Sequence, residues 1–152
     1  MGFIYSAPLD AVAFTTAVDI FECTVAADKG VWVHAMELHQ TTDLGDAQEE
    51  VLRIGLYRGV TAGSGGTGLT EVAYDNAGNP TVGMAVTPRT TASTGGTLID
   101  LLGWNIRIPT RWIWTPETRP YIGPDDDPFS FRLLAAPADS VTVSGVLIWQ
   151  EA

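Results

Sequence analysis

The residues best suited to binding a metal are few, and their spacing keeps them apart. His34 and His39 are the only histidines, and they lie five residues apart in a segment whose alternating pattern predicts a β-strand. Side chains at an odd spacing on a strand point to opposite faces, so these two are not expected to share a metal ion. His34 falls on the predicted face of Trp32, Met36 and Leu38, which indicates a core histidine with its hydrogen bonds satisfied.

Nucleophilic catalysis has no assembled machinery in the sequence. Cys23 is the only cysteine, so the chain has no internal disulfide framework. Its predicted strand puts it on the face of Phe21 and Val25, which indicates a buried, inert thiol. No serine lies in a G-x-S-x-G elbow. Because no nucleophile, base and orienting group come together, we expect no enzymatic activity and no cofactor.

Two loops have compositions that could bind anions or cations. Residues 63–68 match G-x-G-x-x-G letter by letter, but no helical pattern follows, so we expect an inter-strand loop and no dinucleotide site. Asp125, Asp126 and Asp127 could supply oxygen ligands to calcium. This triplet lacks the spacing of an EF-hand, so a solvated acidic loop is favoured and calcium is the open alternative.

Tryptophan and arginine gather in one short stretch of the chain. Trp112 and Trp114 share a predicted strand face, and Arg111 and Arg119 lie close to them in the sequence. Two indoles on one face can stack on sugar rings, and they can also form a subunit interface, where Trp and Arg are enriched. The arginines favour the second interpretation, so these four residues are the predicted oligomer interface.

Strands must position all of these residues, because period-two alternation dominates the sequence. About eight strands are indicated, separated by turn signals such as Asp28-Lys29-Gly30 and the residues 75–80 and 123–128. The pattern predicts an all-β, antiparallel β-sandwich, and eight strands favour a jelly roll. We expect an N-terminal arm over residues 1–17 and one jelly-roll domain over residues 18–152, with Phe3, Ile4 and Tyr5 as an apolar segment that binds a partner.

Composition limits the classes of partner. The 152 residues suit one domain, and eight Lys and Arg against eighteen Asp and Glu give a formal net charge of −10. Such a surface repels phosphate, so nucleic acid is not an expected partner. Anionic lipid is disfavoured for the same reason, and no apolar stretch reaches the roughly 18 residues of a membrane span, so no membrane partner is expected.

The order of features along the chain resembles small virion proteins of tailed bacteriophages, of the jelly-roll capsid decoration or cement type. An apolar, threonine-containing segment at residues 3–16 precedes Val18-Asp19-Ile20-Phe21-Glu22. Residues 45–50 precede a strand, the glycine-rich loop follows it, and Pro116-Glu117-Thr118-Arg119-Pro120 follows Trp104-Asn105. None of these features is a catalytic signature.

This resemblance implies a structural role on the outside of a virion, after synthesis in the cytoplasm of a bacterial host. It implies a homotrimer that binds the major capsid protein and stabilises the outer capsid surface. The alternative is a head-fibre or tail-associated module that recognises host surface glycans through Trp112 and Trp114. Deletion of residues 2–8 is expected to abolish capsid binding while leaving a folded domain.

Overall fold

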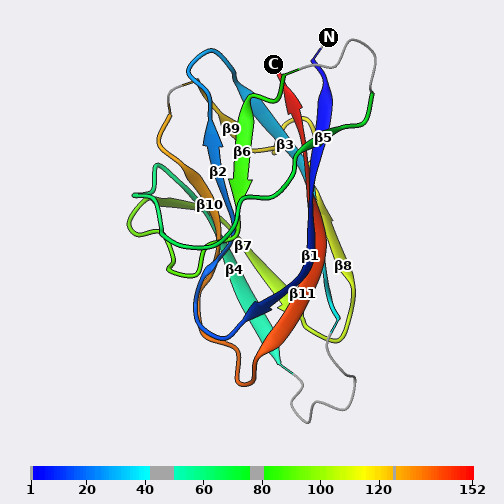
Figure 1. Cartoon of the computed structure of the whole chain (residues 1–152), viewed down its shortest axis with the longest axis vertical. Helices are drawn as coiled ribbons and strands as arrows, with labels where there is room; N and C mark the ends of the chain where they lie inside the picture. Colours follow the sequence, from blue (N-terminus) through cyan, green and yellow to red (C-terminus); the bar gives the residue numbers. More distant parts are fainter. Residues whose placement is uncertain (1, 42–49, 76–80, 125) are drawn as a thin grey trace.

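The computed structural model describes residues 2–41, 50–75, 81–124 and 126–152. Residues 45–49 of the virion resemblance and Asp125 of the acidic triplet lie outside this part. The described residues form strands and loops without any helix, so they contain no helix able to cross a membrane (Figure 1). The two ends of the chain lie side by side at the top of the molecule in Figure 1.

The strands form two antiparallel sheets. The first sheet has the order β5-β1-β11-β3-β8, and β9 also pairs with β3. Its strands are β1 (Ile4–Phe14), β3 (Val31–Gln40), β5 (Val72–Ala73), β8 (Thr110–Ile113), β9 (Tyr121–Ile122) and β11 (Val141–Glu151). The second sheet has the order β6-β2-β10-β4-β7. Its strands are β2 (Asp19–Val25), β4 (Val51–Arg58), β6 (Met84–Thr87), β7 (Thr97–Asn105) and β10 (Phe129–Leu133).

The pairing follows the wrapping of a jelly roll. Eight strands remain when the short strands β5, β6 and β9 are set aside. The first of the eight pairs with the last, the second with the second last, and so on inward: β1 with β11, β2 with β10, β3 with β8, and β4 with β7. The predicted antiparallel sandwich is therefore confirmed. The short strands β5, β6 and β9 bring the number in the described part to eleven.

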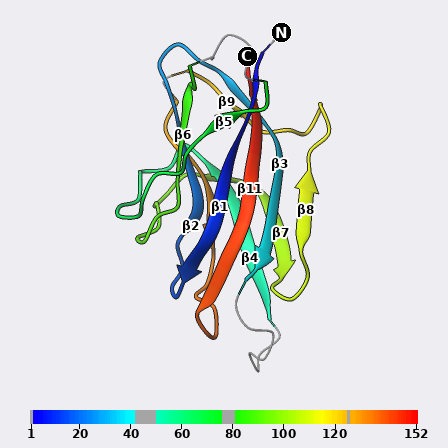
Figure 2. The same ribbon diagram turned by 45° about the vertical axis from the view of Figure 1, so that its right-hand side comes forward.

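The core lies between the two sheets and is built by alternation. In β10, Phe129, Phe131 and Leu133 are buried, and Phe131 makes edge contacts with Phe21 and Phe129 at ring distances of 6.2 and 5.3 Å. Figure 2 shows β1, β11 and β3 side by side, and Trp149 of β11 stacks on Tyr5 of β1 with the rings 5.9 Å apart. Trp114, which follows β8 of the first sheet, lies with its ring 6.1 Å from that of Phe131, so an aromatic contact also joins the two layers.

A β-bulge in β3 moves Trp32 and His34 off the face that they are predicted to share with Met36 and Leu38. Ala35 pairs with Ile148 and Val33 with Trp149, which leaves His34 as the extra residue. Val33 and Met36 are both buried as a result, and Trp32 and His34 lie on the outer face of the sheet. The prediction of a core histidine is wrong. The His34 Nε2 atom instead lies 3.3 Å from Gln150 Oε1.

Strand β1 is part of the sandwich rather than an arm. It pairs with β11 from Ile4↔Gln150 to Phe14↔Val141, and Tyr5 has no exposed surface. Residues 4–14 therefore belong to the same packed unit as the chain after residue 18. The expected division into an arm over 1–17 and a separate domain does not describe this strand, because its inward side chains complete the core.

Candidate interaction surfaces

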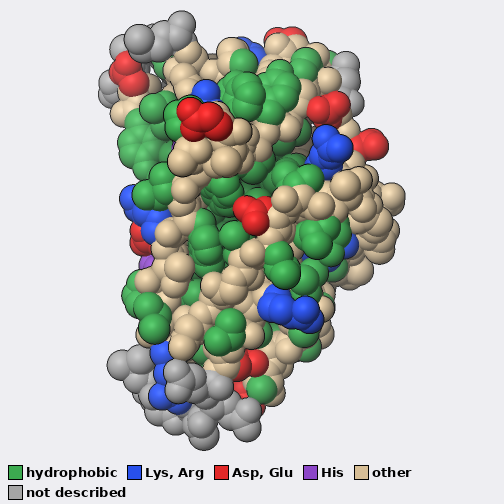
Figure 3. Space-filling view, turned by 180° about the vertical axis from the view of Figure 1, so that it is seen from behind, with side chains coloured by type: hydrophobic (Ala, Val, Ile, Leu, Met, Phe, Trp, Pro, Cys, Tyr) green, Lys and Arg blue, Asp and Glu red, His purple; other side chains and the backbone are tan. Residues whose placement is uncertain are grey.

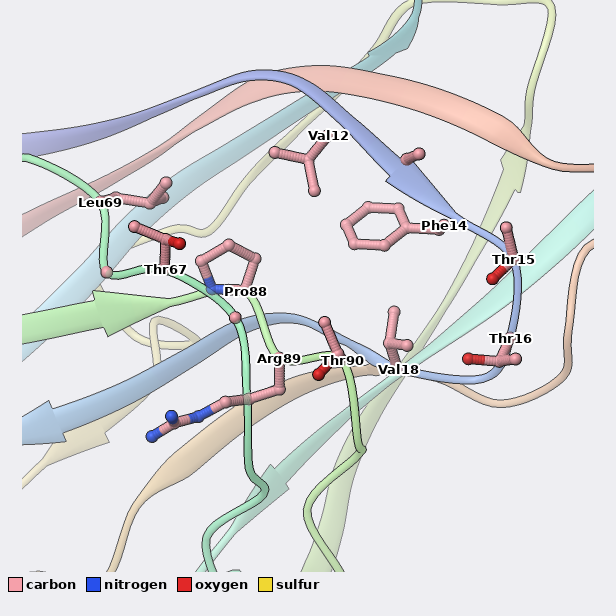
Figure 4. A pocket seen from close by; sticks show the side chains of 13 residues that line it. Val12, Phe14, Thr15, Thr16, Val18, Thr67, Leu69, Pro88, Arg89 and Thr90 are labelled. Carbon is pink, nitrogen blue, oxygen red and sulfur yellow. The ribbon is translucent and has the colours of Figure 1, made fainter.

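An apolar pocket of about 360 Å³ opens at the edge of the sandwich, beside the end of β1 (Figure 4). Val12 and Phe14 of β1 form one wall, and Leu69 and Pro88 face them from two loop segments. The threonine side chains 15, 16, 67 and 90 also border it. Its volume falls in the range of roughly 300–1,000 Å³ that is typical of binding pockets.

The β1 wall is shaped by an irregularity in the strand. The register with β11 shifts between Leu9 and Val12, and Ala11 has a positive φ of 51°. A left-handed conformation is uncommon for alanine, and here the backbone N–H of Ala11 donates to Ser144 Oγ at 2.9 Å. The bulge directs Val12 and Phe14 toward the gap between the sheets.

The opposite wall comes from the glycine-rich loop and the segment before β7. Isolated β-bridges join Thr61 to Thr94 and Ser64 to Thr91, so the two segments support each other. Gly66 has a φ of +80°, and a Cβ atom there would lie 1.9 Å from the carbonyl oxygen of Pro88. The motif at 63–68 therefore provides a close loop-to-loop approach, and the segment after it leads to the short strand β5.

A buried polar network anchors both segments to the second sheet. Glu22 accepts hydrogen bonds from Arg89 Nε at 2.9 Å and from the Gly63 backbone N–H at 2.7 Å. Asp19 accepts from the backbone N–H and the hydroxyl of Ser93 at 2.9 and 3.0 Å. Arg132 Nη2 donates to the same hydroxyl at 2.9 Å. Arg89 therefore turns away from the apolar pocket, as Figure 4 shows.

The two carboxylates of this network are the main residues that sequence reasoning missed. Both Asp19 and Glu22 are essentially without solvent exposure. Burial raises the pKa of Asp19, and the hydrogen bonds from Ser93 and the charge of Arg132 act in the opposite direction. The available signal was the presence of two acidic residues inside a strand of mostly apolar side chains, because a buried charge requires a partner.

Exposed large apolar side chains gather in two places. The first, which we call the β7 patch, has side chains 44 to 50% exposed, and it consists of Leu98, Ile99 and Leu101. Ile113 is also exposed, but it leaves β8 on the face opposite the core-packed Trp112 and Trp114. The second, the N-terminal patch, has side chains 41 to 65% exposed, and it consists of Phe3, Ile4, Val72 and Tyr74. Figure 3 shows the face turned away in Figure 1, with hydrophobic side chains over much of its middle and single acidic and basic side chains among and around them.

The three residues of the predicted partner-binding segment differ in exposure. Phe3 and Ile4 remain exposed in the N-terminal patch, and the backbone N–H of Tyr74 donates to the Ile4 carbonyl at 2.9 Å. Tyr5 points into the core, so it is not available to a partner. The patch surrounds a hollow of about 430 Å³ lined by Gly2, Phe3, Ile4, Tyr74 and Asp75.

The predicted tryptophan and arginine interface does not form one surface. Trp112 and Trp114 do share a face, but they are half-buried and pack against the core. Arg111 points to the other side of β8, where its Nε lies 2.7 Å from Glu37 Oε2. Alternation along β8 separates the residues, because neighbouring side chains of a strand leave on opposite faces.

Arg119 belongs to a different cluster on the outer face of the first sheet. Its guanidinium lies 4.7 Å from the ring centroid of Trp32, which in turn lies 4.5 Å from the ring of Tyr121. Arg119 Nη1 is also 3.5 Å from His34 Nε2. The β3 bulge places Trp32 and His34 here, so this contact depends on a feature that alternation alone does not show.

The remaining candidate groups from the sequence are the cysteine and the acidic loop. Cys23 is fully buried, and burial raises the pKa of its thiol, in agreement with the predicted inert cysteine. Asp126 and Asp127 line a polar hollow of about 390 Å³ together with Arg58. Within the described ranges, no group of three or more His, Cys, Asp or Glu side chains is arranged to hold a metal ion.

Comparison of the chain with protein-family models, with curated proteins and with solved structures found no match.

Proposed function

We propose that this chain is a non-enzymatic structural protein that decorates the outer surface of a tailed-phage capsid as a trimer. The jelly-roll fold and the low proportion of charged residues, 17% of the chain, suit packing against copies and a protein lattice. Two separate apolar patches on one small domain provide surfaces for more than one contact.

The observation that carries the proposal is the N-terminal patch. Phe3 and Ile4 are exposed, yet β1, which begins at Ile4, is paired on both sides near this end, with β11 and β5. The Phe3 carbonyl accepts a hydrogen bond from the Glu151 backbone N–H at 3.0 Å. A partner that covers these side chains gains apolar burial without first ordering a flexible segment, because the sheet has already fixed the backbone. The major capsid protein is the proposed partner.

Co-sedimentation with capsids tests this proposal. The capsids are assembled from the major capsid protein encoded in the same genome, and the variant is Phe3→Ser combined with Ile4→Ser. We expect at least a tenfold loss of capsid binding, with an unchanged thermal unfolding transition. The matched control is Val51→Ser with Tyr121→Ser, which also removes two exposed apolar side chains. Equal binding by both double variants, or no binding by the wild type, would contradict the proposal.

A second candidate is a head-fibre or tail-associated module that binds host glycans. The indoles of Trp112 and Trp114 face the core, but Tyr121 is half-exposed beside the polar hollow that Arg58, Asp126 and Asp127 line. An aromatic face next to charged hydrogen-bonding groups suits a sugar ring. A glycan array probed with wild type and Tyr121→Ala separates the candidates, because only a glycan module loses signal in the variant.

A further inference from the structure

We propose that the outer face of the first sheet carries a binding site for a carboxylated sugar, built by Arg119, Tyr121, Trp32, His34 and Gln150. The site is separate from the N-terminal patch, so it does not depend on the proposed capsid contact. It shares only Tyr121 with the second candidate function, and it specifies an acidic sugar where that candidate leaves the sugar open.

Arg119 is a half-buried arginine without an acidic partner. The part of the chain that the structure describes has three half-buried arginines, and Arg119 is one of them. Arg89 is paired with Glu22 at 2.7 Å, and Arg132 with Asp19 at 3.7 Å. No described carboxylate lies within ion-pair distance of Arg119, and its Nε atom is buried without a hydrogen-bond partner there. Because a half-buried charge without a counter-charge is costly, an anionic group of a ligand would stabilise it.

The segment that carries Arg119 is fixed to the bulge of β3. The backbone N–H of Val33 donates to the Pro120 carbonyl at 3.0 Å, and the backbone N–H of Trp114 donates to the His34 carbonyl at 3.0 Å. The segment therefore keeps its place before any ligand arrives. Binding at the guanidinium would not have to order the loop first, which lowers its entropic cost.

Tyr121 supplies an aromatic face beside this charge. It pairs with Trp32 across the sheet, with the two rings 4.5 Å apart, and its side chain is 47% exposed. A Cβ atom at Gly30 would lie 2.3 Å from Tyr121 Oη, so the glycine allows the ring to lie against the backbone. A ring held in place and open on one side is a stacking surface for the C–H face of a sugar.

His34 has one nitrogen between two partners. Its Nε2 atom lies 3.3 Å from Gln150 Oε1 and 3.5 Å from Arg119 Nη1. The nitrogen of a neutral imidazole either donates or accepts, so one of these two contacts always lacks its hydrogen bond. Sugar hydroxyls donate as well as accept, and a carboxylate accepts. A ligand with both groups could therefore satisfy whichever side chain is left without a bond.

Strand pairing favours a sugar over an extended peptide. β3 is paired with β11 on one side and with β8 and β9 on the other, and β9 is only two residues long. The site thus offers no long free edge for main-chain recognition, and binding must use side chains. A lone guanidinium fork matches a singly charged carboxylate, and the ring, imidazole and amide match a hydroxylated ring.

A glycan array tests the site. The array carries oligosaccharides that contain uronic or sialic acids, each printed beside the methyl ester of its carboxyl group, together with neutral and sulfated oligosaccharides. The wild type is expected to bind at least one free acid about tenfold more strongly than its ester, because esterification removes the charge that the guanidinium recognises.

The variants are read by this preference rather than by binding alone. Arg119→Gln should bind acid and ester alike, whereas a merely structural role of Arg119 would weaken both members of a pair and keep the preference. Arg53→Gln is the matched control, because Arg53 is an exposed arginine of the second sheet. Tyr121→Ala should weaken acid and ester together. If Arg119→Gln lacks a cooperative thermal transition, Arg119→Met replaces it, since methionine keeps an unbranched side chain over Trp32.

Several results would overturn the site. These are no binding of carboxylated sugars, equal binding of acid and ester by the wild type, binding confined to sulfated sugars, and a preference that survives in Arg119→Gln or is lost in Arg53→Gln. Binding of neutral sugars alone, lost in Tyr121→Ala, would support the second candidate function and remove the acidic-sugar site.

Capsid co-sedimentation separates this inference from the proposed function. Arg119→Gln should bind capsids as the wild type does, because the N-terminal patch is unchanged. A wild type that binds capsids without preferring free acids would lose only the sugar site. A wild type that prefers free acids without binding capsids would lose only the capsid role.

Discussion

Asp19 and Glu22 show how individual residues of this protein combine burial with charge. Both carboxylates lie beneath the loops on β2, and each is paired with an arginine and hydrogen-bonded to a loop backbone N–H. A buried charge without such partners would cost several kcal/mol, so the network specifies where residues 63–68 and 88–93 must lie. Because those residues form one wall of the apolar pocket, the network also positions a surface that carries no charge itself.

The titration of Asp19 leads to a pH prediction. Burial raises its pKa above the ordinary value of 3.8, so between these two values the folded state binds more protons than the unfolded state. The contribution of Asp19 to stability is therefore fully present below the ordinary pKa and declines as the pH rises through the raised pKa. We expect the unfolding free energy of the wild type, relative to Asp19→Asn, to fall as the pH rises above the ordinary pKa of 3.8.

Urea unfolding of both proteins at several pH values measures this difference. Asp10→Asn, at an exposed position of the β1 bulge, is the control for replacement of a carboxylate by an amide. A difference between wild type and Asp19→Asn that grows with rising pH would have the wrong sign and would contradict the assigned cause.

At the scale of elements, β1 decides how the N-terminal residues act. Tyr5 is buried against Trp149, and Phe3, two residues earlier, lies on the surface. Both residues carry large aromatic side chains, so their different roles follow from where each lies relative to the sheet. The exposed residues can contact a partner, and the buried one holds the strand that presents them.

Alanine substitutions separate these two roles. Tyr5→Ala should lower the unfolding free energy by about 3–5 kcal/mol, the usual cost of removing a buried aromatic side chain. Phe3→Ala should lower it by less than about 0.5 kcal/mol, since its side chain is on the surface. Denaturant unfolding measures both values. Similar losses for the two variants would mean that Phe3 is packed as tightly as Tyr5.

At the scale of the whole molecule, the first strand closes the wrapped sandwich against the last. β1 lies between β5 and β11 in the first sheet, and its buried residues contact the same core as the second sheet. The N-terminal segment therefore contributes to folding as well as to any partner contact. This differs from the expectation that residues 2–8 can be removed from an intact domain.

Deletion of residues 2–8 is accordingly expected to prevent stable folding. The deletion removes Tyr5 and Ala7 from the core and leaves the adjacent part of β11 without its partner. Near-UV circular dichroism and denaturant titration should show no fixed aromatic signal and no cooperative transition. The Phe3→Ser and Ile4→Ser double variant is the control, because it changes the same segment and keeps the strand. A cooperative transition in the deletion variant would contradict this role of β1.

Local sequence determined the fold class and much of the core, because apolar residues recur at every second position of a strand that is buried on one face. Phe129, Phe131 and Leu133 show this alternation, and all three are buried. The acidic composition and the single buried cysteine were also readable, since neither depends on which strands pair.

Only the tertiary structure decided the surfaces. One extra residue at His34 moved Trp32 to the outer face, and a bulge of this kind is set by pairing with β11 rather than by local pattern. The pocket joins residues 12–18, 66–69 and 88–90, which only the wrapping of the chain brings together. Alternation alone places Arg111 and Trp112 on opposite faces of β8. Which of these two faces is buried depends on the side of β8 against which the second sheet packs. The physical reason is that pairing and packing are long-range, whereas side-chain alternation is local.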